Sequence, residues 1–190
     1  MKYFKHIIIF IFINFLAFSS FANEFVGIIG AGVGEVKNQN NQKLENGSKI
    51  FYGDTIIVGS KSTAQVLFLD QTVMTLGEDS ELTIDEFVYD PQTNDGKFVS
   101  NIKSGTIKII TGKISKKDPD NLEIKIPTGA IGARGTEFVV LANSKNENTV
   151  LLLGPGPNNS LGMTPGNLEV TDGVNSVSII QPGFETVVTK

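Results

Sequence analysis

The sequence has 190 residues, with 16 basic and 20 acidic side chains, no cysteine, no tryptophan and one histidine. A chain of this length can bury a core large enough for one domain without disulfides. The absence of cysteine excludes a disulfide framework and thiolate chemistry. The negative balance of charge disfavours nucleic acid as a partner.

The N-terminal residues predict a signal peptide. Lys2 and Lys5 precede an apolar run at 7–18, and Ser-Phe-Ala ends at Ala22, so residues 1–22 would be removed and Asn23 would become the first residue. A run of this length is shorter than the ~20 residues that cross a bilayer as a helix, although a retained anchor is the alternative. The remaining chain, with 14 basic and 20 acidic residues, has a net charge of −6. We expect it in the periplasm or secreted, without a transmembrane anchor.

Catalysis is not expected of this chain. The only histidine, His6, lies in the predicted signal peptide. Once that peptide is removed, the protein cannot form a catalytic triad, a histidine proton shuttle or a histidine zinc site. Outside that segment the aromatic residues are Tyr52, Tyr89 and seven phenylalanines, which is a poor supply of platforms for sugar rings. An enzyme that uses carboxylates alone is a distant third possibility.

The rest of the chain, 23–190, consists of short β-branched or alternating runs at roughly ten-residue spacing, separated by Gly, Asp, Asn or Pro. This pattern predicts an all-β single domain that forms a roll, a short β-solenoid or a sandwich, with no significant helix after the signal peptide. Polar turns are expected at "DPQTNDGKF" and "KISKKDPDN", and a surface loop at 154–166. The expected strands are "DTIIVGS", "AQVLFLD", "QTVMTLG", "ELTIDEFVY", "GTIKIITG", "NLEIKIP", "TEFVVLA", "TVLLL", "NLEVTDG", "SVSIIQPG" and "ETVVTK".

Two segments near the ends of the chain echo each other. Residues 35–58 and 169–188 both contain Glu-Val, a polar turn, a β-branched run, a glycine turn and a final strand, and Gly53 matches Gly183. The echo favours strands from the two ends of the chain pairing in one roll or short solenoid.

The acidic segment "GEDSELTIDE" is a candidate calcium loop that we interpret differently. Its carboxylates lack the alternate spacing and central glycine of an EF-type loop, and its leucine and isoleucine indicate a strand with a solvated face. We therefore expect no metal and no cofactor. The carboxylates are those of Glu78, Asp79, Glu81, Asp85 and Glu86.

Three stretches resemble the FecR domain of bacterial envelope proteins: "FYGDTIIVGSKSTAQVLFLDQTVMTLGEDSELTIDEFVYDP", "SGTIKIITGKI" and "IKIPTGAIGARGTEFVV". The likeness covers about 27–188. Its most specific parts are the turns at Gly53-Asp54 and at Asp70, the "SGTIKIITGK" strand, and Arg-Gly-Thr at 134–136. One departure is Gln71, where the family usually places glycine.

The resemblance implies an all-β periplasmic domain that relays a contact from an outer-membrane receptor to a sigma-factor regulator. Only a handful of residues precede the apolar run, so we expect no anti-sigma segment in this sequence. We therefore expect a protein-binding or sensing module of the envelope with an unidentified protein partner. The alternative is a structural or surface-associated envelope protein.

The segment "PTGAIGARGTEF" at 127–138 holds the only arginine among fifteen lysines. A phosphate cradle would need a helix after the last glycine, but "EFVVLA" predicts a strand, so the glycines are expected in turns or bulges. We predict that Arg134 is a buried structural clamp paired with Asp54 or Asp70. The alternative is a solvated arginine. The predicted structural motif is Arg134, Gly135, Thr136, Gly132, Gly53, Asp54 and Asp70.

Overall fold

The structure, a computed structural model, describes residues 24–143, 146–158 and 165–189. Most of this part of the chain is strand, with one short helix. The strands are β1 Phe25–Val33, β2 Val36–Asn38, β3 Lys49–Phe51, β4 Thr55–Val58, β5 Thr63–Phe68, β6 Val73–Leu76, β7 Glu81–Tyr89, β8 Gly96–Ile110, β9 Leu122–Ile126, β10 Gly129–Arg134, β11 Glu137–Ala142, β12 Glu147–Gly154, β13 Asn167–Thr171, β14 Ser176–Ile179 and β15 Glu185–Thr189.

The strands form two layers that share β8. We call them sheet A, in the order β3-β1-β5-β6-β8-β11-β12-β15, and sheet B, in the order β2-β4-β7-β8-β9-β10-β13-β14. The first part of β8, 96–104, pairs in sheet B, and its last part, 105–110, pairs in sheet A. Only β8 and β9 pair in parallel; the other ladders between described strands are antiparallel.

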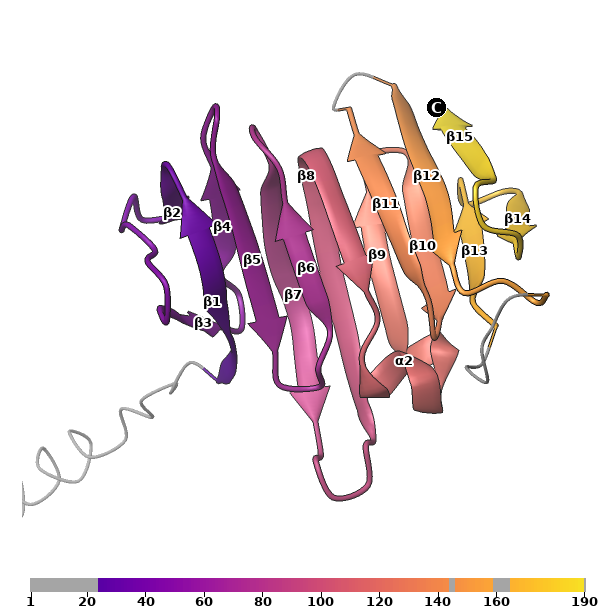
Figure 1. The fold of residues 1–190 in the computed structure, drawn as a ribbon, viewed down its shortest axis with the longest axis horizontal. Coiled ribbons are helices and arrows are strands. Elements are labelled where there is room, and N and C mark those ends of the chain that lie inside the picture. The colour runs from indigo at the N-terminus through magenta and orange to yellow at the C-terminus, as the bar shows by residue number, and fades with distance from the viewer. Residues whose placement is uncertain (1–23, 144–145, 159–164, 190) are drawn as a thin grey trace, which may run out of the picture.

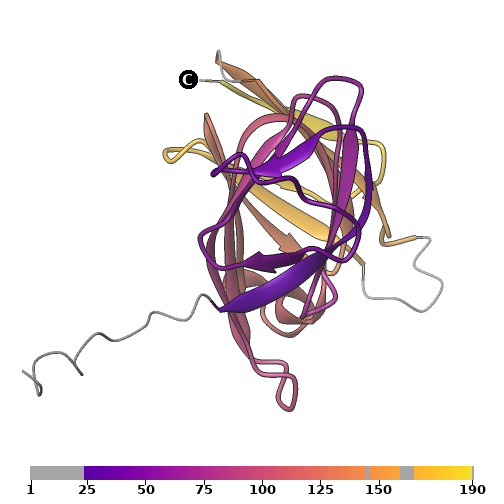
Figure 2. The same cartoon turned by 90° about the vertical axis from the view of Figure 1, so that its left-hand side faces the viewer.

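The chain advances steadily from one end of this double layer to the other. Figure 1 shows β1 to β3 at one end and β14 and β15 at the opposite end, with sheet A nearer the viewer. Along the long axis, in Figure 2, the strands wind around a common interior. The architecture is an all-β single domain, as the sequence predicts.

One hydrophobic core fills the space between the sheets. Side chains alternate along each strand, so that every second residue points inward, as in β9 with Leu122, Ile124 and Ile126. Near the middle, Phe68, Phe87 and Phe98 pack together, with ring centroids 4.7–5.9 Å apart. These contacts join β5 of sheet A to β7 and β8 of sheet B.

One of the expected polar turns is a short helix. Lys113–Lys117 forms α2, a single turn with Ile114 and Ser115 buried, and Pro119–Asn121 follows as a 3-10 turn. The Asp118 side chain accepts a hydrogen bond from the Asp120 amide and so caps the 3-10 turn. Sequence periodicity could not indicate α2 because five residues do not complete two helical repeats.

The echo between the chain ends holds at the level of the turns only. Gly53 and Gly183 have φ of 81° and 84°, and in each turn the next amide donates to the carbonyl three residues earlier, as in a type II turn. The expected pairing of strands from the two ends is wrong. Among the described strands, β3 pairs only with β1, β14 only with β13 and β15 only with β12, because the chain advances along the double layer without returning.

Two sequence predictions fall largely outside the described residues. The signal peptide 1–22 and its cleavage site at Ala22 and Asn23 lie wholly outside them, as does the middle of the expected loop at 154–166. At the base of that loop the Gly166 amide donates to the Pro155 carbonyl at 2.8 Å. Within the described residues no helix is long and apolar enough to cross a membrane.

Candidate functional site

The segment "PTGAIGARGTEF" carries the chain from sheet B to sheet A. Its middle, Gly129–Arg134, is the β10 strand, and Gly135 and Thr136 connect that strand to β11. Gly129 is required by close approach, since a Cβ there would lie 1.9 Å from the Thr171 carbonyl oxygen of β13. Thr136 is buried, and its hydroxyl donates to the Gly154 carbonyl at 2.8 Å. The segment is a crossing of the fold, not a cradle for a ligand.

The predicted burial and pairing of Arg134 are wrong. Alternation along β10 points Ala133 into the core, so Arg134 is exposed on the outer side of sheet B. Among the described residues it forms no ion pair, and its guanidinium has no hydrogen bond. Arg134 is therefore a solvated arginine, which was the alternative interpretation of the sequence.

The two carboxylates proposed as partners of Arg134 have other hydrogen-bond donors. Asp54 accepts a hydrogen bond from the Phe51 amide at 2.9 Å, inside the Gly53 turn. Asp70 is fully buried and accepts from the Thr72 amide at 3.0 Å and from the Thr72 hydroxyl at 2.8 Å. Burial raises the pKa of Asp70, although these hydrogen bonds act in the opposite direction.

The outer side of sheet B is mostly polar and contains several ion pairs. Lys103 pairs with Glu81 at 2.7 Å, and Lys97 pairs with Glu86 at 2.8 Å. Lys125 pairs with Asp85 at 3.1 Å. Three carboxylates of the candidate calcium segment therefore lie on a strand with a solvated face. No group of three or more His, Cys, Asp or Glu side chains suited to a metal occurs among the described residues.

The outer side of sheet A is apolar across several neighbouring strands. Its outward-pointing aliphatic side chains range from half-buried to more than 40% exposed, the most exposed being Leu141 at 45% and Val187 at 46%. We call this surface the apolar face. It consists of Ile28, Leu67, Val73, Ile110, Val139, Leu141, Leu151, Leu153 and Val187.

Strand register arranges the apolar face in rows. Leu67 of β5 lies opposite Val73 of β6, and Val73 lies opposite Ile110 of β8. In the next row, Val139 of β11 lies opposite Leu151 of β12. Side chains directly opposite each other on one side of a sheet are about 5 Å apart at Cβ, and Ile110 and Val139 are diagonal neighbours, which is within reach of long side chains.

One ion pair interrupts the apolar face. The Lys108 Nζ lies 2.6 Å from the Glu137 Oε1, on the neighbouring strands β8 and β11. Both side chains remain more than a third exposed, so the pair contributes little to stability. It places one positive and one negative charge among aliphatic side chains, where a partner could recognise them.

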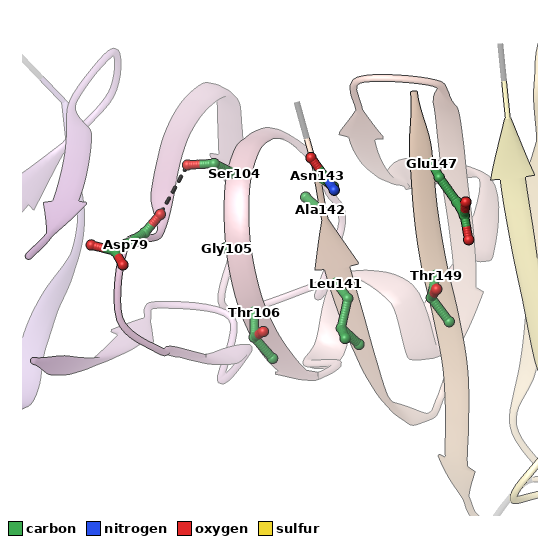
Figure 3. A pocket seen from close by; sticks show the side chains of 9 residues that line it. All are labelled: Asp79, Ser104, Gly105, Thr106, Leu141, Ala142, Asn143, Glu147 and Thr149. Carbon is green, nitrogen blue, oxygen red and sulfur yellow. Dashed lines mark hydrogen bonds between the residues drawn. The ribbon is translucent and has the colours of Figure 1, made fainter. Parts of the chain in front are cut away.

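A hollow of about 580 Å³ borders the apolar face where β8 passes from sheet B to sheet A. Figure 3 shows Thr106, Leu141 and Thr149 on three neighbouring strands, with Glu147 near the start of β12. The Ser104 hydroxyl donates to the Asp79 carbonyl at 3.0 Å on the opposite side of the hollow. Its lining combines aliphatic and hydroxyl groups with two carboxylates. The remaining lining residues are Gly105, Ala142 and Asn143.

The family model described as FecR protein matches residues 54–154, which is 101 of the 190 residues and runs from the Gly53-Asp54 turn to the end of β12. The chain belongs to the FecR family. The apolar rows on β5, β6, β8, β11 and β12 lie inside the matched FecR region. No curated protein matched the chain.

Solved structures support the fold of this FecR domain. Two crystal structures of a "putative anti-sigma factor" from Parabacteroides distasonis, at 1.65 and 2.50 Å resolution, each match with a TM-score of 0.51 and 14% identity. Each match covers 71% of this chain and 54% of the other, so the FecR-family chain spans about half the length of those proteins. At this identity the likeness shows a shared fold.

Sequence reasoning did not identify the apolar face. It predicted the β-branched and leucine-rich runs as strands without assigning their outward residues to a surface. A detectable signal was present in "TVLLLG" and "TEFVVLA", where apolar residues occupy both alternating positions. A strand with one solvated side normally alternates apolar with polar residues. Continuous apolar runs on an antiparallel sheet with no covering layer indicate an exposed apolar surface.

Proposed function

We propose that this FecR-family chain is an exported protein-binding module of the bacterial envelope, which contacts its partner through the apolar face. The observation that carries the proposal is the contrast between the two outer sides: sheet B is mostly polar, whereas sheet A carries outward aliphatic side chains on at least five strands. Monomeric soluble proteins rarely expose large contiguous apolar patches without a binding role. The related fold of a protein described as an anti-sigma factor supports a protein as partner.

Burial of the apolar face would supply the binding energy. Its most exposed members, including Ile110, Leu141 and Leu153, retain 39–45% of their surface. Covering such a side chain completely gains on the order of 1 kcal/mol, because full burial of a free aliphatic side chain is worth about 1.5–3 kcal/mol. The charges of Lys108 and Glu137 would fix the orientation of the bound partner more than they would raise its affinity.

The test compares the two outer sides of the same molecule. A photo-crosslinking amino acid at Ile110 or Leu153 on sheet A is expected to capture a partner of defined mass in the intact envelope. The same probe at Lys103 or Arg134, on sheet B, is the matched control and is expected to capture none. Equal capture from both sides would contradict the proposal.

Charge substitutions provide the second half of the test. Ile110→Lys is expected to weaken partner binding by at least about tenfold while shifting the free energy of unfolding by roughly 0.5 kcal/mol, as is usual for surface positions. Glu169→Lys, at an exposed position on the outer side of sheet B, is expected to change neither. Unimpaired binding by Ile110→Lys would assign the contact to another surface.

We also propose that the chain acts after export. The lysine-flanked apolar run and Ser-Phe-Ala ending at Ala22 support cleavage before Asn23. Mass measurement of the envelope product should give the chain that begins at Asn23. Recovery of the uncleaved chain in the membrane fraction would instead assign residues 1–22 as an anchor.

A further inference from the structure

The last strand of sheet A has a free edge. β15 pairs with β12 through 185–189, and among the described residues no strand pairs with its other edge. The Leu152 amide donates to the Phe184 carbonyl at 3.0 Å, and bonded and non-bonded pairs alternate in an antiparallel ladder. The backbone groups of Glu185, Val187 and Thr189 therefore point away from β12.

Apart from the charge of Glu185, this edge lacks the features that normally prevent pairing with another chain. Natural edge strands carry lysine, proline, an inward charge or a bulge. β15 reads "ETVVT", with no lysine or proline, and pairs with β12 without a register shift. At the opposite end of the molecule the β3 edge begins with Lys49, and beside β2 a bridge between Lys37 and Lys43 folds the chain back over the edge.

We propose that the free edge of β15 binds β15 of a second copy of this chain, antiparallel and related by a two-fold axis at Val187. In that register Val187 faces Val187 of the second copy, and Glu185 faces Thr189. Glu185, Val187 and Thr189 direct their amides and carbonyls to the free edge, so in this register these backbone groups can hydrogen-bond to those of the second copy. Like charges do not meet, whereas centring the axis on Glu185 would oppose two glutamates, which is destabilising.

Continuity of the apolar face also favours a second copy as the occupant. Val187 lies opposite Thr149 of β12, which lies opposite Leu141 of β11. Pairing through β15 would align this row with its counterpart in the second copy, so that sheet A and its apolar face continue across the dimer. Self-complementary pairing of identical surfaces is the geometry of a two-fold dimer. The inference does not depend on the proposed partner of the apolar face.

Disulfide trapping tests the register directly. The full chain contains no cysteine, so Val187→Cys introduces a single thiol. Directly opposed residues in a hydrogen-bonded antiparallel pair lie ~5.5 Å apart at Cα, within the ~4.4–6.8 Å range of disulfides. Oxidation should give a covalent dimer at least about tenfold faster than for Ser178→Cys on the neighbouring edge strand β14. Equal rates for the two variants would overturn the proposal.

Sedimentation equilibrium of the full chain tests the energetics. We expect a concentration-dependent monomer–dimer equilibrium. Thr189→Glu should weaken dimerisation, because the introduced carboxylate would face Glu185 of the second copy. The double variant Thr189→Glu with Glu185→Lys should restore it, because opposite charges would then face each other. Val187→Pro removes an amide that has no partner strand among the described residues. It should also weaken dimerisation, with circular dichroism showing an unchanged fold. Ser178→Lys is the control and should leave association unchanged. A chain that stays monomeric at about 1 mM, or that dimerises equally in all variants, overturns the proposal.

Discussion

Gln71 occupies a backbone conformation that suits glycine. It lies in the turn between β5 and β6 with φ of 71°, and its amide donates to the Phe68 carbonyl at 3.0 Å. The resemblance to the FecR domain singled out this position, where the family usually has glycine. The structure provides the physical reason, since a Cβ in the left-handed region is crowded by the backbone at a cost of about 1–2 kcal/mol.

Gln71→Gly is therefore expected to stabilise the protein by about 0.5–1 kcal/mol, because the relief of strain is partly offset by the greater freedom of glycine in the unfolded chain. Denaturant unfolding should show a higher midpoint with an unchanged slope. Gln71→Ala is the control, because alanine keeps the Cβ and should give no increase. A midpoint that does not rise in Gln71→Gly would show that the turn is unstrained.

At the scale of elements, the Asp70 turn holds α2 in place. The Asp70 carbonyl accepts from the Lys113 amide at 2.8 Å, and the Thr72 hydroxyl accepts from the Gly112 amide at 3.0 Å. The carboxylate of Asp70 in turn accepts from the Thr72 hydroxyl. One buried carboxylate thus organises the junction between the β5–β6 hairpin and the segment that follows β8.

The raised pKa of Asp70 gives this junction a defined pH dependence. Burial raises the pKa of Asp70 above its ordinary 3.8, so the folded protein binds a proton more tightly there than the unfolded chain does. The contribution of Asp70 to the free energy of unfolding is most favourable below pH 3.8. It decreases as the pH rises to the pKa of Asp70 in the folded protein. The charge of Asp70 also helps to raise the pKa of Tyr89, after the larger effect of burial.

Asp70→Asn isolates this contribution. The difference in the free energy of unfolding between the wild type and Asp70→Asn should decrease from about pH 3.5 upward and level off above the folded pKa. Urea unfolding at half-unit steps of pH measures it. Asp90→Asn, at an exposed carboxylate whose pKa is lowered by hydrogen bonds from Gln92 and Thr93, should show the opposite slope. A difference that does not change with pH would mean that Asp70 titrates normally.

Strand by strand, the sequence predicted the elements that alternate or contain β-branched runs. All eleven expected runs contain strands, and "ELTIDEFVY" matches β7 residue for residue. The missed strands include β1 and β10, which are rich in glycine. In both, a neighbouring backbone approaches so closely that a Cβ would collide, at Gly27 with the Leu67 carbonyl and at Gly129 with that of Thr171. Such contacts depend on tertiary structure, which local patterns do not report.

The candidate site was less predictable than the fold. Arg134 was singled out as unique in type, yet whether it points inward depended on the phase of β10, a strand that was itself missed. The apolar face depends on which side of each strand is covered, and that follows from the order of strands in two sheets. Period-two patterns fix which residues share a side but not which side meets the core.

At the scale of the whole molecule, β8 links the two sheets mechanically. Its fifteen residues pair with β7 and β9 in sheet B and with β6 and β11 in sheet A. Arrays of strands that contact only their neighbours can unfold from one end. Here a single core cluster extends from Val26 to Val188 and is crossed by one continuous strand. We therefore expect one cooperative unfolding transition.

The two tyrosines outside the predicted signal peptide make this expectation testable. Tyr52 and Tyr89 both lie toward the β1 end, whereas circular dichroism reports strands along the whole molecule. Leu168→Ala removes a fully buried side chain from β13, near the opposite end, and should cost about 2–5 kcal/mol. If unfolding is two-state, tyrosine fluorescence and circular dichroism must give the same lowered midpoint. Leu153→Ala, at an outward position, should lower both midpoints much less. A circular dichroism midpoint that falls while the tyrosine midpoint stays in place would show that the β13–β15 end unfolds separately, and that β8 does not transmit stability along the molecule.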